Sequence, residues 1–243
     1  MHLITSMQVL KYLRLPFNFD AALLRDDLDQ LTEARWLPHY QKLHYTGEWS
    51  AIPLRSIGGK ADNILIAPTG HIAYEDTVFL SSCPYFQKVL QHFKCQLKAV
   101  RLLKLNAGAI IKEHRDAELY FEKGEIRLHI PVITNDEVEF YLDNERMFLK
   151  KGECWYMNFN LPHSINNKGK TDRIHLVVDA IVNDWVMELF EQPELNRKII
   201  EEPGYDENTK RLMIARFREM NTETSNRLAD EMEGSLRPGL PPE

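Results

Sequence analysis

Short runs of apolar or alternating residues fill the middle of the chain, between residues 100 and 182. These runs cover residues 100–105, 125–133, 137–142, 154–159 and 173–182. Turn-forming residues separate them at 106–108, 135–136, 150–152 and 166–172. Many short strands bounded by turn residues are typical of a β-sandwich or a β-barrel. The pattern therefore predicts a mainly β domain.

Helical spacing precedes this region. Apolar residues recur every three or four positions at Ala21, Leu24, Leu28 and Leu31, and Asp20 stands before them as the expected N-cap. We expect a second helix over residues 84–93 and a strand over residues 49–57, which ends at two glycines. These elements predict helices that flank the β domain on its N-terminal side.

The last part of the chain, from Asn183, is helical in its spacing and rich in charged residues. Its end, at residues 237–242, is rich in proline, which is typical of a frayed terminus. We therefore expect a β domain with its flanking helices over residues 1–182 and a helical C-terminal extension over residues 183–243. The extension either packs as a simple helix or forms the surface of a homodimer.

Composition and charge exclude several classes of protein. The chain has 243 residues, 44% of them hydrophobic, and 30 basic against 36 acidic residues give a net charge of −6. No run is dense in Lys and Arg, so nucleic acid is not an expected partner. No apolar run is long enough to span a bilayer, and the N-terminus lacks the order of a signal peptide. The 3 cysteines form no CxxC pair, as in reduced proteins. The sequence predicts a cytoplasmic protein that binds neither nucleic acid nor membranes.

Two histidines and an aspartate have the residue types of a metal site. His114 and Asp116 are two positions apart, so on an extended segment both side chains point to the same side. His163 follows a strand-like run 163 − 114 = 49 residues later, which leaves room for strands that return the chain to the same end of a barrel. Two imidazoles and one carboxylate form the facial triad of non-haem Fe(II) oxygenases. We expect these three residues to hold a metal ion.

Two strand-like runs carry an arginine and a histidine at alternate positions. Arg127 and His129 share one strand face, and Arg173 and His175 do the same, with aliphatic residues on the opposite faces. A guanidinium that faces a barrel interior requires an anion, because an unpaired buried charge is costly. A dicarboxylate ligand would supply two anions, one for each arginine. The alternative is that either strand faces the other way and leaves these side chains in water.

These residues resemble the aspartyl/asparaginyl β-hydroxylase family of Fe(II)- and 2-oxoglutarate-dependent oxygenases, in particular its bacterial branch of free-proline hydroxylases. The matching segments are residues 114–119, 127–129, 152–155 and 161–164, followed by Arg173 and Asp179. The resemblance implies a double-stranded β-helix, which is a jelly-roll or cupin-like barrel. It also implies Fe(II) at His114, Asp116 and His163, with 2-oxoglutarate and O2 as co-substrates.

The resemblance assigns roles to three further residues. In the family, an arginine ten residues after the second histidine holds the far carboxylate of 2-oxoglutarate, and Arg173 has this spacing. By the same resemblance, Arg127 and His129 lie near the carboxylate beside the keto group. Asp116 is present here, as in the small-molecule branch, whereas the animal peptidyl members lack a carboxylate at this position. This departure favours a free substrate.

The resemblance therefore implies a hydroxylase that acts on an sp3 carbon of a free amino acid or a small amino-acid derivative and releases succinate and CO2. No catalytic residue beyond the metal centre is required. Arg55 is a candidate to bind the substrate carboxylate and Trp49 a candidate wall of the pocket, with a surface arginine and a core tryptophan as the alternatives.

Three other functions stay open on the sequence alone. The first keeps the same chemistry but acts on an Asp, Asn or Pro side chain in a peptide. The second is a cupin-like metal enzyme that performs no oxidation, and the third is a metal-free sensor of a small ligand. The last two predict that no succinate is formed.

Overall fold

The structure is a computed structural model that describes residues 7–31, 34–67, 72–116, 119–202, 207–221, 223–234 and 236. Two compact units divide the chain. Leu10–Lys198 forms one unit, and Met1–Val9 together with Ile199–Glu243 forms the other. No helix among the described residues is both long and apolar enough to cross a membrane.

Strands dominate the regular structure. In chain order they are β1 (Met7–Asn18), β2 (Leu37–Pro38), β3 (Tyr45–Thr46), β4 (Trp49–Ile57), β5 (Tyr74–Asp76), β6 (Leu97–Leu105), β7 (Ile110–His114), β8 (Glu125–Ile133), β9 (Val138–Leu142), β10 (Glu145–Met147), β11 (Glu153–Met157), β12 (His163–Asn167), β13 (Arg173–Ile181) and β14 (Arg197–Glu202). The α-helices are α1 (Ala21–Asp29), α2 (Val78–Ser81), α3 (Pro84–Leu90), α4 (Asp184–Glu191), α5 (Glu207–Met220) and α6 (Glu223–Gly234). Two 3-10 turns, η1 (Lys42–His44) and η2 (Phe121–Lys123), complete the elements.

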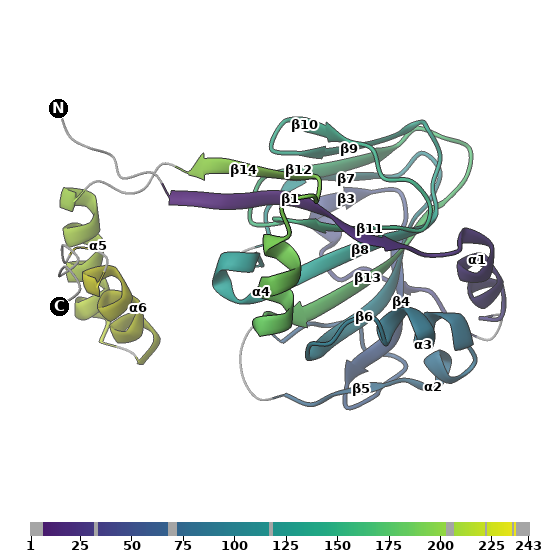
Figure 1. The fold of residues 1–243 in the computed structure, drawn as a ribbon, viewed down its shortest axis with the longest axis horizontal. Helices are drawn as coiled ribbons and strands as arrows, with labels where there is room; N and C mark the ends of the chain where they lie inside the picture. Colours follow the sequence, from purple (N-terminus) through teal and green to yellow (C-terminus); the bar gives the residue numbers. More distant parts are fainter. Residues whose placement is uncertain are drawn as a thin grey trace. The chain divides into compact units, whose positions relative to one another are not determined.

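The strands β6 to β13 are shared between two sheets (Figure 1). The larger sheet contains them in the order β11-β8-β13-β6, and the smaller sheet in the order β10-β9-β12-β7. Their pairings are antiparallel. A chain that alternates between two facing sheets in this order is a jelly roll. The expected mainly β fold, a double-stranded β-helix, is confirmed.

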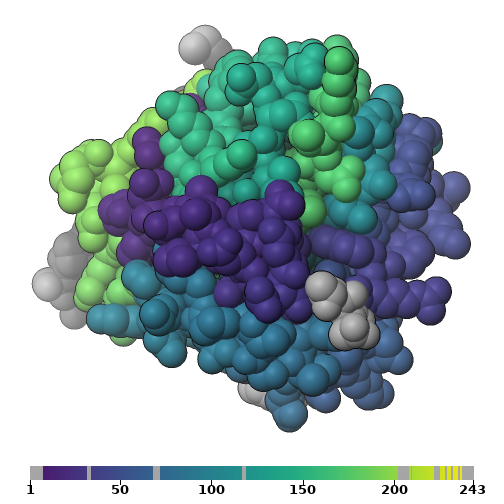
Figure 2. All heavy atoms as spheres, turned by 90° about the vertical axis from the view of Figure 1, so that its right-hand side faces the viewer, coloured from purple at the N-terminus to yellow at the C-terminus, as the bar shows by residue number. Residues whose placement is uncertain are grey.

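The two faces of the larger sheet have different surroundings. On β13, Ile174, Leu176 and Val178 belong to the main hydrophobic core, which also contains Phe86 of α3 and Leu24 of α1. The helices therefore cover this face, and α1 packs against α3 in the view of Figure 2.

The opposite face of the larger sheet carries the arginines and histidines of β8 and β13. Their exposed fractions are 9% for Arg127, 4% for His129, 2% for Arg173 and 2% for His175. All four side chains are thus enclosed in the barrel interior. The expectation that they face inward is confirmed, and the alternative that they face water is excluded.

The three N-terminal elements expected from the sequence are present, although α3 ends at Leu90 and not at residue 93, and the short elements β2, β3, β5 and α2 were not expected. α1 begins after Asp20, whose side chain accepts from the backbone N–H groups of Ala22 and Leu23, and β4 has the expected bounds. β1 was not expected from the sequence. Its Lys11 is buried, and Nζ lies 3.0 Å from Asp143 Oδ2 and 3.1 Å from Glu145 Oε2. The charged Lys11 breaks the apolar pattern by which a buried strand is predicted. Its partners, Asp143 and Glu145, lie far away in the sequence, so the local pattern gives no sign that this lysine is paired.

The region after residue 182 is not entirely helical. α4 packs Val186, Leu189 and Phe190 into the main hydrophobic core, so this helix belongs to the first compact unit. The strand β14 then interrupts the expected helical extension. In the other unit, α5 and α6 pack against each other. The proline-rich end at residues 237–242 lies outside the described residues.

Gly152 is required by the backbone at the junction between β8, β11 and α1. Its φ angle is +80°, and an added Cβ would overlap the carbonyl oxygen of Phe19. We expect Gly152→Ala to lower the free energy of unfolding by about 2 kcal/mol or more, since strain and overlap add. Gly108 is the matched control, because its φ is +77° but nothing lies within 4 Å of an added Cβ. Gly108→Ala should cost only about 1 kcal/mol in the same denaturation assay, and equal losses would contradict this account.

Candidate metal centre

His114 and His163 lie side by side because their strands pair. β7 and β12 are antiparallel neighbours, and the two histidines are opposite each other. The register shifts along this pair, because three positions from Ile111 to His114 match two positions from Ile165 to His163. The extra residue on β7 is a β-bulge, which re-aims neighbouring side chains. It turns His114 toward His163, with 4.2 Å between the ring centroids.

Asp116 completes the cluster. Its backbone N–H donates to the carbonyl of Phe159, 2.9 Å away, in the segment that leads to β12. Its Oδ1 lies 3.8 Å from Nε2 of His114. One ligand atom from each of His114, Asp116 and His163 lies within 4.8 Å of the other two. The structure thus brings together all three residues that the sequence suggested as metal ligands.

The hydrogen bonds of the two histidines leave the same ring nitrogen free on each. Nδ1 of His114 is 2.8 Å from the carbonyl of Lys112, and Nδ1 of His163 is 3.0 Å from the carbonyl of Leu161. A carbonyl can only accept, so Nδ1 carries the proton and Nε2 presents a lone pair. Burial, with the nearby His114, lowers the pKa of His163 to about 4, so this ring is neutral at pH 7. Both rings are ready to bind a cation through Nε2.

The anions that pair with Arg127 are side chains of the protein itself. Its Nε donates to Oδ1 of Asp179 at 2.6 Å, and its Nη2 donates to Oδ2 of Asp179 at 3.1 Å. Its Nη1 donates to Oδ2 of Asp116 at 2.6 Å. Burial disfavours the charged form of Asp116, but Arg127 and the nearby histidines and Arg101 together outweigh burial and hold the pKa of this carboxyl below its usual value. Arg127 therefore requires no anion from a ligand, contrary to the expectation from the sequence, and its contact with a cofactor stays a prediction.

Arg173 is buried without a carboxylate partner among the described residues. Its Nη2 donates to Nδ1 of His175, 3.1 Å away, and its guanidinium lies 5.6 Å from the ring centroid of Phe140. Burial lowers the pKa of Arg173 to about 9, which leaves the side chain charged at neutral pH. A buried charge of this kind fits an anion that is not part of the chain.

His129 adds a second unsatisfied polar group to the barrel interior. Its Nδ1 lies 3.2 Å from Nδ1 of His175, whereas its buried Nε2 has no hydrogen-bond partner among the described residues. Burial, together with the charges of Arg173 and Arg127, lowers the pKa of His129, so its ring is neutral at pH 7. The interior between Arg173 and the metal cluster thus has the polar groups that a carboxylate-bearing cofactor requires.

Trp49, an expected wall of the substrate pocket, lies next to the metal cluster. It is 8% exposed, and its ring centroid is 6.4 Å from that of His114. It stacks on His39 with 3.5 Å between the ring centroids. His39 was not singled out in the sequence, because a lone histidine in an irregular segment carries no pattern. The two stacked rings thus lie beside the cluster.

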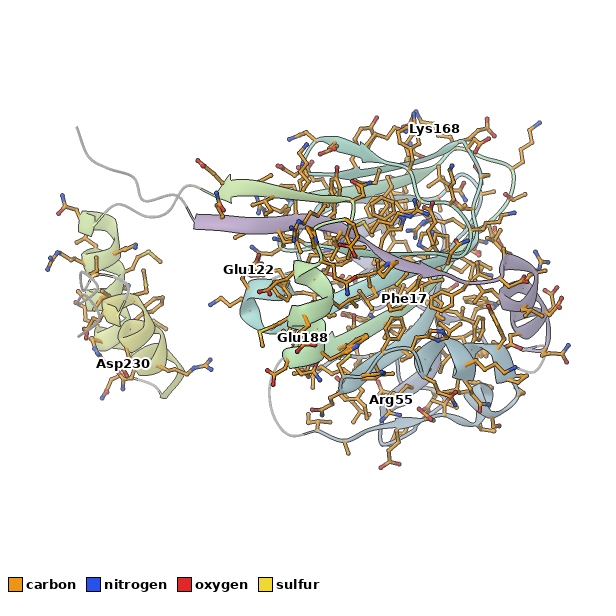
Figure 3. The ribbon with its side chains drawn as sticks, viewed as in Figure 1. Phe17, Arg55, Glu122, Lys168, Glu188 and Asp230 are labelled. Carbon is orange, nitrogen blue, oxygen red and sulfur yellow. The ribbon has the colours of Figure 1, made fainter. Side chains whose placement is uncertain are left out.

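Arg55, the other expected substrate contact, lies on the opposite face of β4. A register shift between Pro53 and Arg55 places Arg55 opposite Val100, which belongs to the core on the helix-covered face. Arg55 pairs there with Asp76 of β5, and Figure 3 shows it beside that strand. The structure does not bring Arg55 to the cluster, because the bulge reverses the face that alternation predicts.

Arg101 is the arginine that the sequence analysis missed. It is 2% exposed on β6, and its Nη2 donates to Oδ2 of Asp179 at 3.1 Å. Its Nε is buried and has no partner within the described part of the chain. The signal was available in the alternation of β6, where Arg101 shares a face with Leu103 and Leu105, the partners of His175 and Arg173 on β13.

One protein-family model matches the chain. The model of the aspartyl/asparaginyl beta-hydroxylase family matches residues 18–182, which is more than half of the chain. Among curated proteins, L-proline cis-4-hydroxylase of Rhizobium meliloti (strain 1021) is 28% identical over 191 residues. This match covers 76% of the chain and 66% of the relative, so the chain spans just under two thirds of the relative's length.

Solved structures include similar barrels. An oxidoreductase of the 2OG-Fe(II) oxygenase family from Burkholderia pseudomallei matches with a TM-score of 0.45 and 13% identity, over 68% of this chain and 82% of that one. A prolyl-4-hydroxylase from Pseudomonas putida matches with a TM-score of 0.44 and 10% identity, over 71% and 92% of the two chains. These TM-scores are too low to support a fold assignment. The evidence for the fold is therefore the strand order of the chain itself.

Proposed function

The chain belongs to the aspartyl/asparaginyl beta-hydroxylase family, and from this premise we propose that it is an Fe(II)- and 2-oxoglutarate-dependent dioxygenase. Its reaction hydroxylates an sp3 carbon of a free amino acid or of a small amino-acid derivative and releases succinate and CO2. The relative from Rhizobium meliloti is named for L-proline, so L-proline is the first substrate to test.

One observation carries this proposal. Arg173 is buried without a carboxylate partner among the described residues, inside the same barrel as the His114, Asp116 and His163 cluster. A metal site alone suits many enzymes, whereas a metal site beside an unpaired buried guanidinium suits a metal and an anionic cofactor together. 2-Oxoglutarate has a carboxylate that can pair with this arginine.

The residues of the cluster would hold Fe(II) through the two Nε2 atoms and one oxygen of Asp116. When bound, Fe(II) and 2-oxoglutarate supply the oxidising chemistry, in which one atom of O2 enters succinate and the other enters the hydroxyl group of the product. The work of the chain is to position the two organic molecules and to exclude water. Arg173 would hold the far carboxylate of 2-oxoglutarate, and Arg127 and His129 are the residues proposed for the carboxylate beside the keto group.

The substrate side has a different lining. Trp49 and His39 form an aromatic wall beside the cluster, and the free Nε of Arg101 offers a donor to an anionic group. We assign the role that the sequence suggested for Arg55 to Arg101, a buried arginine on the correct face whose Nε has no partner among the described residues. An amino-acid carboxylate fits such a donor.

Product analysis with single amino acids tests this function. Anaerobically Fe(II)-loaded protein receives 2-oxoglutarate, oxygen and one amino acid at a time, and mass spectrometry follows succinate and any product with one added oxygen atom. We expect one amino acid, with L-proline tested first, to raise succinate formation and to gain oxygen in equal amount. Succinate without any hydroxylated amino acid would transfer the proposal to a peptide substrate. Absence of succinate from folded, metal-loaded protein would overturn it and favour the cupin-like or sensor functions.

Arg101→Gln should weaken binding of the amino-acid substrate. Loss of a charged hydrogen-bond donor costs about 1.5 to 3 kcal/mol, so we expect the KM of the substrate to rise by roughly 10-fold to 150-fold. Arg55→Gln is the matched control on the opposite face, and its KM should stay within about 2-fold of that of the parent protein. Steady-state kinetics with the identified substrate measures both values. A large effect of Arg55→Gln with none from Arg101→Gln would reverse this assignment.

The expected homodimer and cytoplasmic location stay predictions.

A further inference from the structure

Asp179 is a buried carboxylate that connects two arginines of the barrel interior. It is 1% exposed on β13. Oδ1 accepts from Nε of Arg127 at 2.6 Å, and Oδ2 accepts from Nη2 of Arg127 and from Nη2 of Arg101, each at 3.1 Å. A carboxylate with three such bonds and almost no exposure is held in one orientation.

The contact with Asp179 fixes the plane of the Arg127 guanidinium. Two parallel N–H donors of Arg127 bind the two oxygens of Asp179, which is the bidentate geometry that allows little rotation. The remaining nitrogen, Nη1, then points at Oδ2 of Asp116 at 2.6 Å. Asp179 thus determines, through Arg127, which oxygen of Asp116 is occupied by a hydrogen bond. Oδ1 of Asp116, on the side of His114, remains for a metal ion.

The charges of the four groups also balance. Arg101 and Arg127 carry two positive charges, and Asp116 and Asp179 carry two negative charges. Without the charge of Asp179, Asp116 would be the one anion left among these four groups, and two buried guanidinium groups would face it. Arg127 would then compete with a metal ion for Asp116, and a dication would enter a region with net positive charge.

We propose that Asp179 is a positioning residue of the metal centre, which holds Arg127 so that Asp116 presents a single oxygen to the metal ion. This inference rests on the proposed metal site but not on the identity of the substrate. Partners behind a metal ligand change metal affinity by about 10-fold to 100-fold. We expect a loss of this size in Asp179→Asn, which keeps the shape of the side chain and removes its charge.

Cobalt(II) is a suitable probe, because its visible absorption reports the ligand set and calorimetry reports its affinity. Asp179→Asn should bind Co(II) about 10-fold to 100-fold more weakly, with an altered visible spectrum. The matched control is Glu125→Gln on β8, which removes a carboxylate from the Lys98–Glu125 pair, where Nζ and Oε1 are 2.7 Å apart. This control should bind Co(II) as the parent protein does. Parent-like affinity and spectrum in folded Asp179→Asn would overturn the proposal.

A second pair of variants tests whether Asp179 acts through Arg127, even where Asp179→Asn alone fails to fold. Arg127→Met and the double variant Arg127→Met/Asp179→Asn should share the same Co(II) spectrum, because the guanidinium that connects Asp179 to Asp116 is absent from both. A different Co(II) spectrum in the double variant would show that Asp179 acts on the ligand set by another route and would overturn the proposal. Absence of Co(II) binding by the parent protein would instead remove the metal site itself, and with it the proposed dioxygenase.

Discussion

Replacing His163 with alanine is expected to abolish metal binding and 2-oxoglutarate turnover. His163 is 4% exposed, and its Nδ1 is engaged by a carbonyl, so Nε2 is the atom available to a metal ion. Even partners behind a ligand cost about 10-fold to 100-fold in affinity, so loss of a ligand should cost more than about 100-fold. Isothermal titration with Mn(II) and a succinate assay with Fe(II) measure the two effects.

His92→Ala is the matched control for this prediction. Nδ1 of His92 lies 2.8 Å from the carbonyl of Lys88, the same kind of contact that His163 makes, but His92 packs on Phe17 and Phe19 away from the cluster. Metal affinity and turnover should be unchanged in His92→Ala. A folded His163→Ala protein that retains both would contradict the assignment of His163 as a ligand.

Replacing Arg173 with methionine is expected to separate cofactor binding from metal binding. Loss of one partner of a buried charge pair costs about 2 to 5 kcal/mol, so the Kd of 2-oxoglutarate should rise by roughly 30-fold or more. Affinity for Mn(II) without the cofactor should stay close to that of the parent protein, because Arg173 contacts His175 and Phe140 and none of the three proposed metal ligands. Calorimetric titrations with each ligand give the two constants.

The stability of Arg173→Met provides an independent check. A buried guanidinium without a carboxylate partner destabilises the free protein, and an apolar side chain of similar length removes that cost. We therefore expect an equal or higher midpoint of thermal unfolding in the absence of cofactor. Arg25→Met, which removes an exposed arginine of the Arg25–Asp29 pair on α1, should change neither binding constant. A marked fall in stability with unchanged cofactor affinity would make Arg173 a structural residue.

Sequence patterns predicted the parts of the fold in which alternation is regular. On β8 and β13 each inward arginine or histidine is separated from the next by one aliphatic residue, so the buried polar row was visible in the sequence. The metal cluster was predicted from residue types, spacing and the family resemblance. In each case the local pattern and the tertiary structure agree.

Bulges and distant partners explain what the sequence did not predict. The bulge on β4 places Arg55 on the helix-covered face, and the bulge on β7 turns His114 toward His163. One extra residue reverses a strand face, and pairing with a neighbour decides where it falls. The pairing of Arg127 with Asp179 was also not apparent from the sequence. The two residues are 179 − 127 = 52 positions apart, and they lie opposite each other only because β8 and β13 pair.

The most direct test of the proposed site is an anaerobic titration of 2-oxoglutarate into the Fe(II)-loaded protein, followed by visible absorption. A keto acid that chelates Fe(II) produces a charge-transfer band, so the titration reports whether the cofactor and the metal occupy one site. We expect a band that saturates at one equivalent of 2-oxoglutarate, requires a much higher concentration in Arg173→Met and is absent in His163→Ala. A folded, iron-loaded protein that shows neither a band nor heat of binding would contradict the assignment of this barrel as a 2-oxoglutarate-dependent oxygenase.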